Sequence, residues 1–222
     1  MSPLLLSLSL AAAAAQPTTY VAVGDSTGAG MGASRGGYPE RLAERLGRAG
    51  LPVQLVNLCY PGARAVDALR LQLPRALANH PRLVTVGIGI NDVLRHTELS
   101  SFARSLDELA QALRSSGARV LLVNVPDLAR SPRAVMDEPP AELRARVRQV
   151  NRAVAEVAAR YRFDLVDLFA AGAEVYGAQG TLSLDLLHPT DEGYDRWAKA
   201  AEPAARRALA PRPGLSPGGR LR

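Results

Sequence analysis

Short apolar runs alternate with longer helix-like segments along this chain, and this alternation limits the fold more than any other feature. Five runs are rich in Val, Leu and Ile, as expected for strands buried on both faces of a parallel sheet: 19–23, 53–58, 83–87, 120–125 and 163–168. Segments with apolar residues three and four positions apart predict helices: 39–49, 65–78, 101–115, 141–161 and 191–210. Repeated strand–helix–strand order implies right-handed crossovers and helices on both faces of the sheet. The predicted fold is therefore α/β, a three-layer α/β/α sandwich with a mainly parallel five-stranded sheet.

Capping and breaking residues set the expected element ends. Pro39 suits the first turn of its helix, and Thr190 suits the N-cap of the last helix. Segment 126–140 (PDLARSPRAVMDEPP) contains four prolines and is predicted to be a long surface loop. In open α/β sheets, ligands bind beyond the carboxyl ends of the strands. The loops that follow the strands are therefore where functional residues are expected.

Length and charge limit the classes of function. The 222 residues suit one domain with a single core, and we expect a monomer. The formal net charge is +6, but residues 205–222 contain five Arg and no acidic residue, which leaves about +1 for the rest. Because the body is nearly neutral, it lacks the basic stripe that nucleic-acid binding requires, and no nucleic-acid partner is expected. The single cysteine, Cys59, excludes an intramolecular disulfide.

The first 15 residues have the character of a leader. A Leu-rich stretch over 4–10 is followed by an Ala run, and this pattern is typical of a secretory signal peptide, although the start carries no Lys or Arg. The stretch is shorter than the roughly 20 apolar residues that cross a bilayer, so no stable membrane insertion is expected. We expect residues 1–15 to be a signal peptide, 16–210 a catalytic domain and 211–222 a disordered basic tail, in a secreted or periplasmic protein. A disordered or mis-assigned start is the alternative.

Ser26 and His188 are the candidate reactive pair. Ser26 follows the first predicted strand in Gly24-Asp25-Ser26-Thr27-Gly28, where the two glycines allow a tight turn, with positive φ if required. A hydroxyl nucleophile needs a base and a carboxylate that orients the base. Asp185 and His188, three residues apart just before the last helix, are suited to those roles. The chain has two other histidines: His80 is expected in a solvated loop, and His96 in a loop near the site.

Hydrolysis of an ester also requires donors for the developing oxyanion. Asn91 lies beyond the third predicted strand in Gly89-Ile90-Asn91-Asp92, and its side-chain amide is one candidate donor. Gly62 follows the second strand and offers an unobstructed backbone N–H. Together with the N–H of Ser26, these groups give three candidate donors from three adjacent loops.

These residues resemble the four sequence blocks of the SGNH (GDSL-type) hydrolase family, named for Ser, Gly, Asn and His. The blocks occur in order at Ser26, Gly62, Asn91 and His188, and the resemblance spans residues 20 to about 200. It implies the flavodoxin-like fold of that family and a serine esterase that cleaves carboxylic esters through an acyl-enzyme on Ser26. His188 would be the base, Asp185 its orienting carboxylate, and Ser26, Gly62 and Asn91 the oxyanion hole. Thr27 departs from the family, in which Leu is common at this position.

The resemblance leaves the substrate open: lipase, lysophospholipase, thioesterase and sugar O-deacetylase activities all occur in the family. The expected partner is a small-molecule, lipid or carbohydrate ester. No cofactor is expected, and no His or Cys cluster has metal-ligand spacing. Two alternatives remain. The first is a flavodoxin-like module that binds a phosphate or FMN, with residues 26–30 cradling the phosphate. The second is a catalytically silent binding protein of the same fold.

Overall fold

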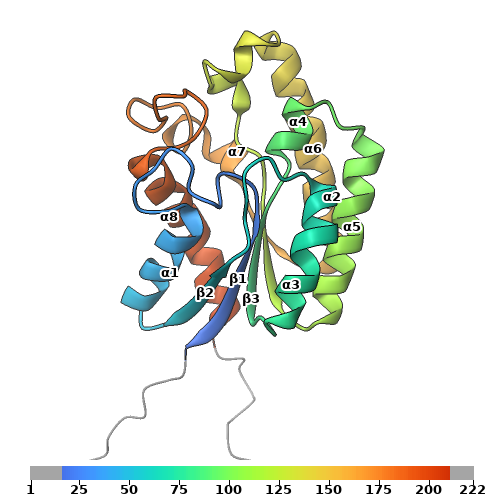
Figure 1. Ribbon diagram of the computed structural model, residues 1–222, viewed down its shortest axis with the longest axis vertical. Helices are drawn as coiled ribbons and strands as arrows, with labels where there is room; N and C mark the ends of the chain where they lie inside the picture. Colours follow the sequence, from blue (N-terminus) through green and yellow to red (C-terminus); the bar gives the residue numbers. More distant parts are fainter. Residues whose placement is uncertain (1–16, 211–222) are drawn as a thin grey trace, which may run out of the picture.

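A computed structural model describes residues 17–210 and contains a five-stranded parallel sheet in the order β2-β1-β3-β4-β5 (Figure 1). The strands are β1 (Thr18–Gly24), β2 (Val53–Asn57), β3 (Leu83–Gly87), β4 (Arg119–Val123) and β5 (Asp164–Val166). Every neighbouring pair is parallel, so all carboxyl ends meet at one edge. All five residues of β3 are buried, as expected at the centre of a covered sheet. The predicted α/β fold class is confirmed.

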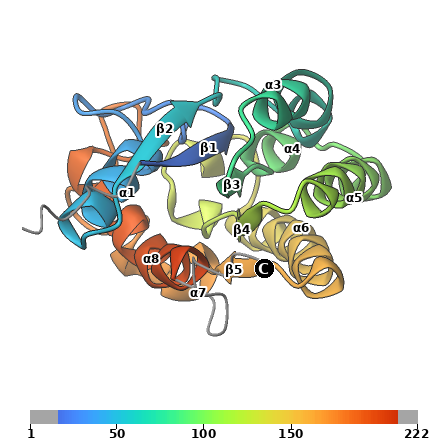
Figure 2. The same cartoon turned by 90° about the horizontal axis from the view of Figure 1, so that it is seen from below.

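Helices cover both faces of the sheet, as the view along the strands in Figure 2 shows. One face is covered by α1 (Tyr38–Arg48) and α8 (Asp191–Leu209), which pack against each other. The other face is covered by α5 (Leu99–Ser115), α6 (Pro140–Tyr161) and a helical segment that comprises α2 (Ala65–Asp67), the π-helical turn η1 (Ala68–Gln72) and α3 (Leu73–Ala78). The molecule is therefore a three-layer sandwich with its apolar core on both sides of the sheet.

The expected helix over 65–78 is interrupted by η1, and this interruption positions a polar side chain. Gln72, at the end of η1, is 1% exposed. Its amide accepts the N–H of Gly24 and donates to the carbonyl of Gly24, both at 2.8 Å. Gln72 thus satisfies both backbone polar groups where β1 ends, just before Ser26. Periodicity alone does not distinguish a π-helical turn from the α-helix on either side of it.

Short elements that the apolar pattern did not predict surround the carboxyl edge. These are α4 (Ile90–Leu94), α7 (Leu168–Ala171) and the 3₁₀ turns η2 (Leu128–Arg130), η3 (Ala134–Met136) and η4 (Gly172–Glu174). Segment 126–139 contains no strand and no α-helix, as its prolines predicted, but the three-residue 3₁₀ turns η2 and η3 lie within it. The predicted loop ends one residue early, because Pro140 begins α6. The fifth strand ends at Val166, before the predicted position 168, because Asp167 accepts the N–H of Ala170 and caps α7.

The predicted helix starts agree more closely with the structure. Pro39 lies in the first turn of α1, and the Thr190 hydroxyl accepts the N–H of Gly193 as N-cap of α8. The proposed leader (1–15) and basic tail (211–222) lie outside the described residues. Among residues 17–210, no helix is both long and apolar enough to span a bilayer.

Candidate active site

The candidate residues come from four segments that meet at the carboxyl edge of the sheet (Figure 1). Ser26 follows β1, Gly62 follows β2, and Asn91 lies in the first turn of α4, just after β3. His188 precedes α8. All four line one cavity of about 200 Å³, called here the Ser26 cavity. The structure therefore brings together residues that are up to 162 positions apart in sequence.

Ser26, His188 and Asp185 form a connected chain of side-chain hydrogen bonds. The Ser26 Oγ and His188 Nε2 atoms are 2.9 Å apart, and His188 Nδ1 is 2.5 Å from Asp185 Oδ2. Ser26 is 6% exposed, and the His188 side chain is 13% exposed. An imidazole held in this way is able to accept the hydroxyl proton, while the carboxylate fixes its tautomer and orientation.

A tight turn before α8 holds Asp185 in place. The Asp185 Oδ1 atom accepts the backbone N–H groups of Leu187 and His188, both at 2.9 Å, and the Ser183 hydroxyl at 2.8 Å. Leu186 has φ of +60°, the left-handed conformation that the turn requires. Partial burial opposes ionisation of Asp185, but these donors and His188 together hold its pKa well below the usual range. Oδ1 is thus fixed by the turn, and Oδ2 is directed at the imidazole.

The loop after Ser26 packs closely against this turn. At Gly32, where φ is +86°, a Cβ atom would lie 2.9 Å from the Cβ of His188 and 2.9 Å from Ser183 Oγ. The Tyr194 hydroxyl of α8 donates to the Met31 carbonyl at 2.8 Å. The Ser26 and His188 segments are therefore held together by close packing at the Gly32 backbone as well as by the side-chain hydrogen bond.

Gly24 and Gly28 flank the turn that contains Ser26, as expected, but the turn does not use the positive φ that glycine allows. Neither has a positive φ. A Cβ at Gly24 would lie 2.7 Å from the Gly87 carbonyl oxygen, and a Cβ at Gly28 would collide with Cys59 Sγ. Lack of space, rather than backbone conformation, therefore requires glycine at both positions.

Asp25 is a feature of the site that the sequence reasoning did not assign a role. Its side chain is 1% exposed, and Oδ1 accepts the backbone N–H of Thr27 at 2.9 Å and the Thr27 hydroxyl at 2.7 Å. Burial raises the pKa of Asp25 to about 6, although the two Thr27 donors favour the ionised form. The Asp-x-Thr spacing, which permits this side-chain turn, was the available signal.

Three residues with candidate N–H donors, Ser26, Gly62 and Asn91, line the Ser26 cavity. The Asn91 side-chain amide donates one hydrogen to the Ala63 carbonyl at 3.0 Å, which leaves its second hydrogen available. Within residues 17–210, the backbone N–H groups of Ser26 and Gly62 have no protein acceptor. Gly62 has φ of +82°. The remaining wall is largely apolar and includes Met31, Ile90, Leu94, Tyr176 and Leu187.

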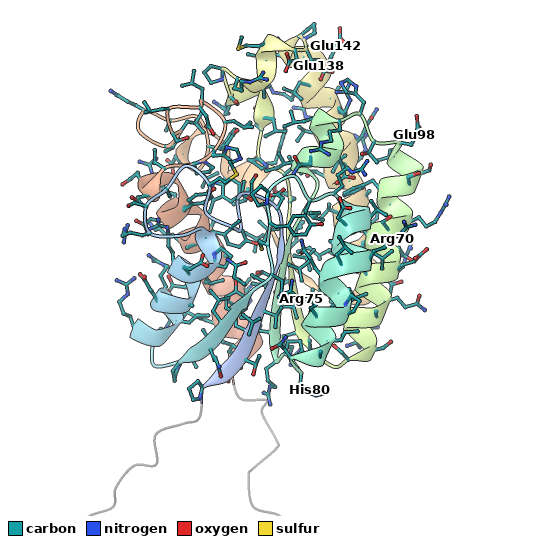
Figure 3. All side chains as sticks on the ribbon, in the orientation of Figure 1. Arg70, Arg75, His80, Glu98, Glu138 and Glu142 are labelled. Atoms are coloured by element: carbon teal, nitrogen blue, oxygen red, sulfur yellow. The ribbon has the colours of Figure 1, made fainter. Side chains whose placement is uncertain are left out.

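The other two histidines lie outside the Ser26 cavity. His80 is exposed at the opposite edge, between α3 and β3 (Figure 3). His96 is exposed just after α4, with its Nε2 atom 3.4 Å from Arg146 Nη1. Neither belongs to the Ser26–His188–Asp185 chain of hydrogen bonds.

The loop at 26–30 is not arranged to cradle a phosphate. The Thr27 N–H donates to the Asp25 side chain, and the Ala29 N–H donates to the Asp25 carbonyl. The Met31 N–H donates to the Ser26 carbonyl. Two of the five amides of this loop, those of Thr27 and Ala29, are therefore already bonded within the chain, and the buried Asp25 carboxylate beside them would repel an anion. The geometry disfavours the flavodoxin-like alternative.

Comparison with known proteins shows the family of this chain. Residues 22–196 match the model of the GDSL-like lipase/acylhydrolase family. The chain belongs to that family. As a GDSL-family protein it is a serine ester hydrolase. It is 31% identical over 186 residues to "Esterase TesA" of Pseudomonas aeruginosa, covering 83% of this chain and 86% of that protein.

Solved structures of GDSL-type enzymes resemble the whole described domain. The crystal structure of TesA superposes with a TM-score of 0.73 and 28% identity, covering 86% of this chain and 99% of that one. A psychrotrophic esterase, EstA from Pseudoalteromonas sp., superposes with a TM-score of 0.71, covering 86% and 98% of the two chains. At 18% identity, EstA supports the shared fold alone.

Proposed function

We propose that this GDSL-family enzyme hydrolyses carboxylic esters through an acyl-enzyme on Ser26. The observation that carries the proposal is the 2.9 Å contact between Ser26 Oγ and His188 Nε2, with Asp185 on the far side of the imidazole. A serine is a weak nucleophile unless a neighbouring base takes its proton. The arrangement supplies that base and holds it in the required orientation.

In the first half-reaction, Ser26 Oγ attacks the ester carbonyl carbon while His188 Nε2 takes the hydroxyl proton. The tetrahedral intermediate collapses, His188 returns the proton to the leaving alcohol, and the acyl group stays on Ser26. A water molecule then attacks the acyl-enzyme with His188 again as base, and the acid is released as Ser26 regains its proton. Asp185 stays ionised throughout and stabilises the imidazolium, a role that its low pKa supports.

We further propose that the N–H groups of Ser26 and Gly62 and the Asn91 amide bind the oxyanion. The availability of these donors in one cavity supports this role. The hydrogen bond from Asn91 to the Ala63 carbonyl fixes the amide before substrate binds, so little reorganisation is needed in the transition state. Loss of one such donor typically reduces the rate by about 10²–10³-fold.

The apolar wall of the Ser26 cavity suits an uncharged acyl group. Met31 and Leu187 contribute from the two loops that flank Ser26 and His188, while Ile90 and Leu94 contribute from α4. The cavity of about 200 Å³ is small beside typical drug-sized ligand pockets of about 300–1,000 Å³. We therefore propose that short acyl chains are better substrates than long ones.

Hydrolysis of aryl acyl esters from acetyl to palmitoyl tests both parts of the proposal. The wild-type enzyme should show its highest kcat/KM at short chain length, and Ser26→Ala should abolish turnover at every length. Ser115→Ala, an exposed serine at the end of α5, is the matched control and should keep wild-type rates. Turnover by Ser26→Ala within a few-fold of wild type would reject the acyl-enzyme, and a maximum at palmitoyl would reject the chain-length preference.

A further inference from the structure

A second cavity, of about 680 Å³, lies beside the Ser26 cavity and is lined by four arginines. We call it the arginine groove. Arg64 comes from the loop after β2, Arg70 from η1, Arg95 from the end of α4 and Arg104 from α5. Figure 3 labels Arg70 on the helical segment that runs beside α5. The groove thus gathers positive charge from four separate elements.

The arginine groove adjoins the Ser26 cavity along the Gly62 loop and α4. Gly62 and Leu94 line the Ser26 cavity, whereas Arg64 and Arg95, two and one residues further along, line the groove. The Arg95 Nη2 atom lies 3.2 Å from the position that a Cβ at residue 62 would occupy. Arg95 therefore stands at the boundary between the two cavities, next to the backbone of a proposed oxyanion donor.

The cations of the groove outnumber its accessible anions. Among residues 17–210, Arg70, Arg95 and Arg104 have no carboxylate within 4.0 Å, and Arg64 Nε is 3.7 Å from Asp67. Three carboxylates also line the groove. Asp92 is 2% exposed and accepts the Ala65 N–H at 3.0 Å, which leaves Glu98 and Glu108 as the exposed anions. Four arginines and two exposed carboxylates thus line the groove.

We propose that the arginine groove is a subsite for an anionic group, a phosphate or a carboxylate, on the part of the ester substrate that extends past Gly62. Guanidinium groups bind the paired oxygens of both anions in a bidentate manner. Arg95 makes the contact nearest the reacting ester, and the other arginines supply the surrounding positive field. The inference rests on the proposed function, because the anion is recognised while its ester lies at Ser26.

Three esters with the same short acyl group test the subsite. They are the monoester of butanediol, the phosphate of that monoester, and the corresponding ester of 4-hydroxybutanoate. The measured quantity is the ratio of kcat/KM for each anionic ester to that of the neutral ester. At low ionic strength, the wild-type enzyme should prefer at least one anionic ester by about 10-fold, the lower end of what a hydrogen bond to a charged group provides. Comparison of the phosphate ester with the carboxylate ester shows which anion the groove selects.

Two pairs of variants locate the effect. Arg95→Gln should reduce the ratio to near one. Arg75→Gln should retain it: this arginine is exposed, lies further along the same helical segment (Figure 3), and has no carboxylate within 4.0 Å among residues 17–210. Glu98→Gln should raise the ratio, and Glu142→Gln, on α6 and outside the groove lining, should not. The wild-type preference should also weaken as salt increases.

Equal hydrolysis of neutral and anionic esters by the wild-type enzyme would overturn the proposal. An equal loss of preference in Arg95→Gln and Arg75→Gln would also overturn it, because the effect would then come from general surface charge. Failure of the proposed function is a different result: the neutral ester would not be cleaved in a Ser26-dependent manner. Circular dichroism and thermal unfolding of each variant exclude misfolding as the cause of a change in the ratio.

Discussion

Thr27 donates both its backbone N–H and its hydroxyl to a single oxygen of Asp25, at 2.9 and 2.7 Å. The two residues flank Ser26, so this paired contact closes the turn that presents the Ser26 hydroxyl. Asp25 is 1% exposed and has no ion pair within the described part of the chain. The ionised form of such a buried carboxylate is stabilised by its two donors, and its contribution to the stability of the protein depends on pH.

Asp25→Asn should change how stability depends on pH. The folded protein has an Asp25 pKa of about 6, above the ordinary 3.8, so it binds more protons than the unfolded chain between these values. Stability therefore falls as pH rises from about 4 to 6, by about 3 kcal/mol, and the loss is complete above pH 6. Asn keeps an oxygen for both Thr27 donors but cannot ionise. Urea unfolding at several pH values should show the free energy of unfolding of the variant rising relative to that of wild type over this interval. Parallel plots of this free energy against pH for the two proteins would contradict the account.

Thr27→Val should destabilise the protein by about 1.5–3 kcal/mol at pH 7, because it removes a hydrogen bond to an ionised buried group without changing side-chain shape. The loss should be smaller near pH 4, where Asp25 is protonated. Thr27→Ser keeps the hydroxyl and is the matched control. Urea unfolding at both pH values measures the differences. Equal stability of the Val and Ser variants at pH 7 would show that the hydroxyl contributes nothing.

Asp185→Asn should lower kcat by about 10⁴-fold, because an amide in place of the carboxylate no longer stabilises the imidazolium and favours the wrong tautomer of His188. Ser183→Ala removes only one of the donors to Asp185 Oδ1 and should have a much smaller effect. Steady-state hydrolysis of an aryl acetate measures both. Comparable losses in the two variants would point to disruption of the turn rather than loss of the carboxylate.

Arg41 should stabilise the packing of α1 against the start of α8. It is 1% exposed and pairs with Asp191 at 2.5 Å and with Asp195 at 3.2 Å, which ties α1 to the start of α8. Arg41→Met should reduce stability by about 3 kcal/mol at neutral pH, at the lower end for a broken buried pair because both carboxylates remain accessible to water.

The effect of Arg41→Met should also depend on pH. Hydrogen bonds from Ser34 and Arg41 lower the pKa of Asp191 to about 2, against partial burial. A lowered acid pKa contributes stability above the unfolded value near 4, and this contribution is lost as pH falls toward 2. The difference between wild type and variant in urea unfolding should therefore shrink over that interval. A constant difference from pH 7 to pH 2 would contradict this assignment.

Much of the fold was predictable because its local and global signals agree. Five buried apolar runs predicted five parallel strands, and the sheet order places the segments with Ser26, Gly62 and Asn91 beside one another. Element ends were less predictable where a side chain overrides the apolar pattern. Asp167 ends the fifth strand early by capping α7, and Val166 is the last strand residue although Leu168 continues the apolar run.

The reactive residues of the site were predictable from the sequence, but the contacts that hold them in position were not. The Ser26, Asp185 and His188 positions follow from chemistry and from the family blocks. The contacts that hold them do not, because they depend on where distant backbone lies. Gln72 reaches Gly24 only because η1 breaks the regular helix, and Gly32 is needed because the His188 turn approaches it closely. The arginine groove likewise collects residues from four elements whose proximity no local pattern reveals.

The most direct test of the account is mass spectrometry of the enzyme after treatment with an aryl phosphonate ester, which traps an activated serine as a stable phosphonyl adduct. We predict one adduct per chain on the peptide that contains Ser26, no adduct in Ser26→Ala, and greatly slowed labelling in His188→Ala. A protein that loses ester hydrolysis while Ser26 stays unmodified, or that carries the adduct on another residue, would contradict the assignment of Ser26 as the nucleophile.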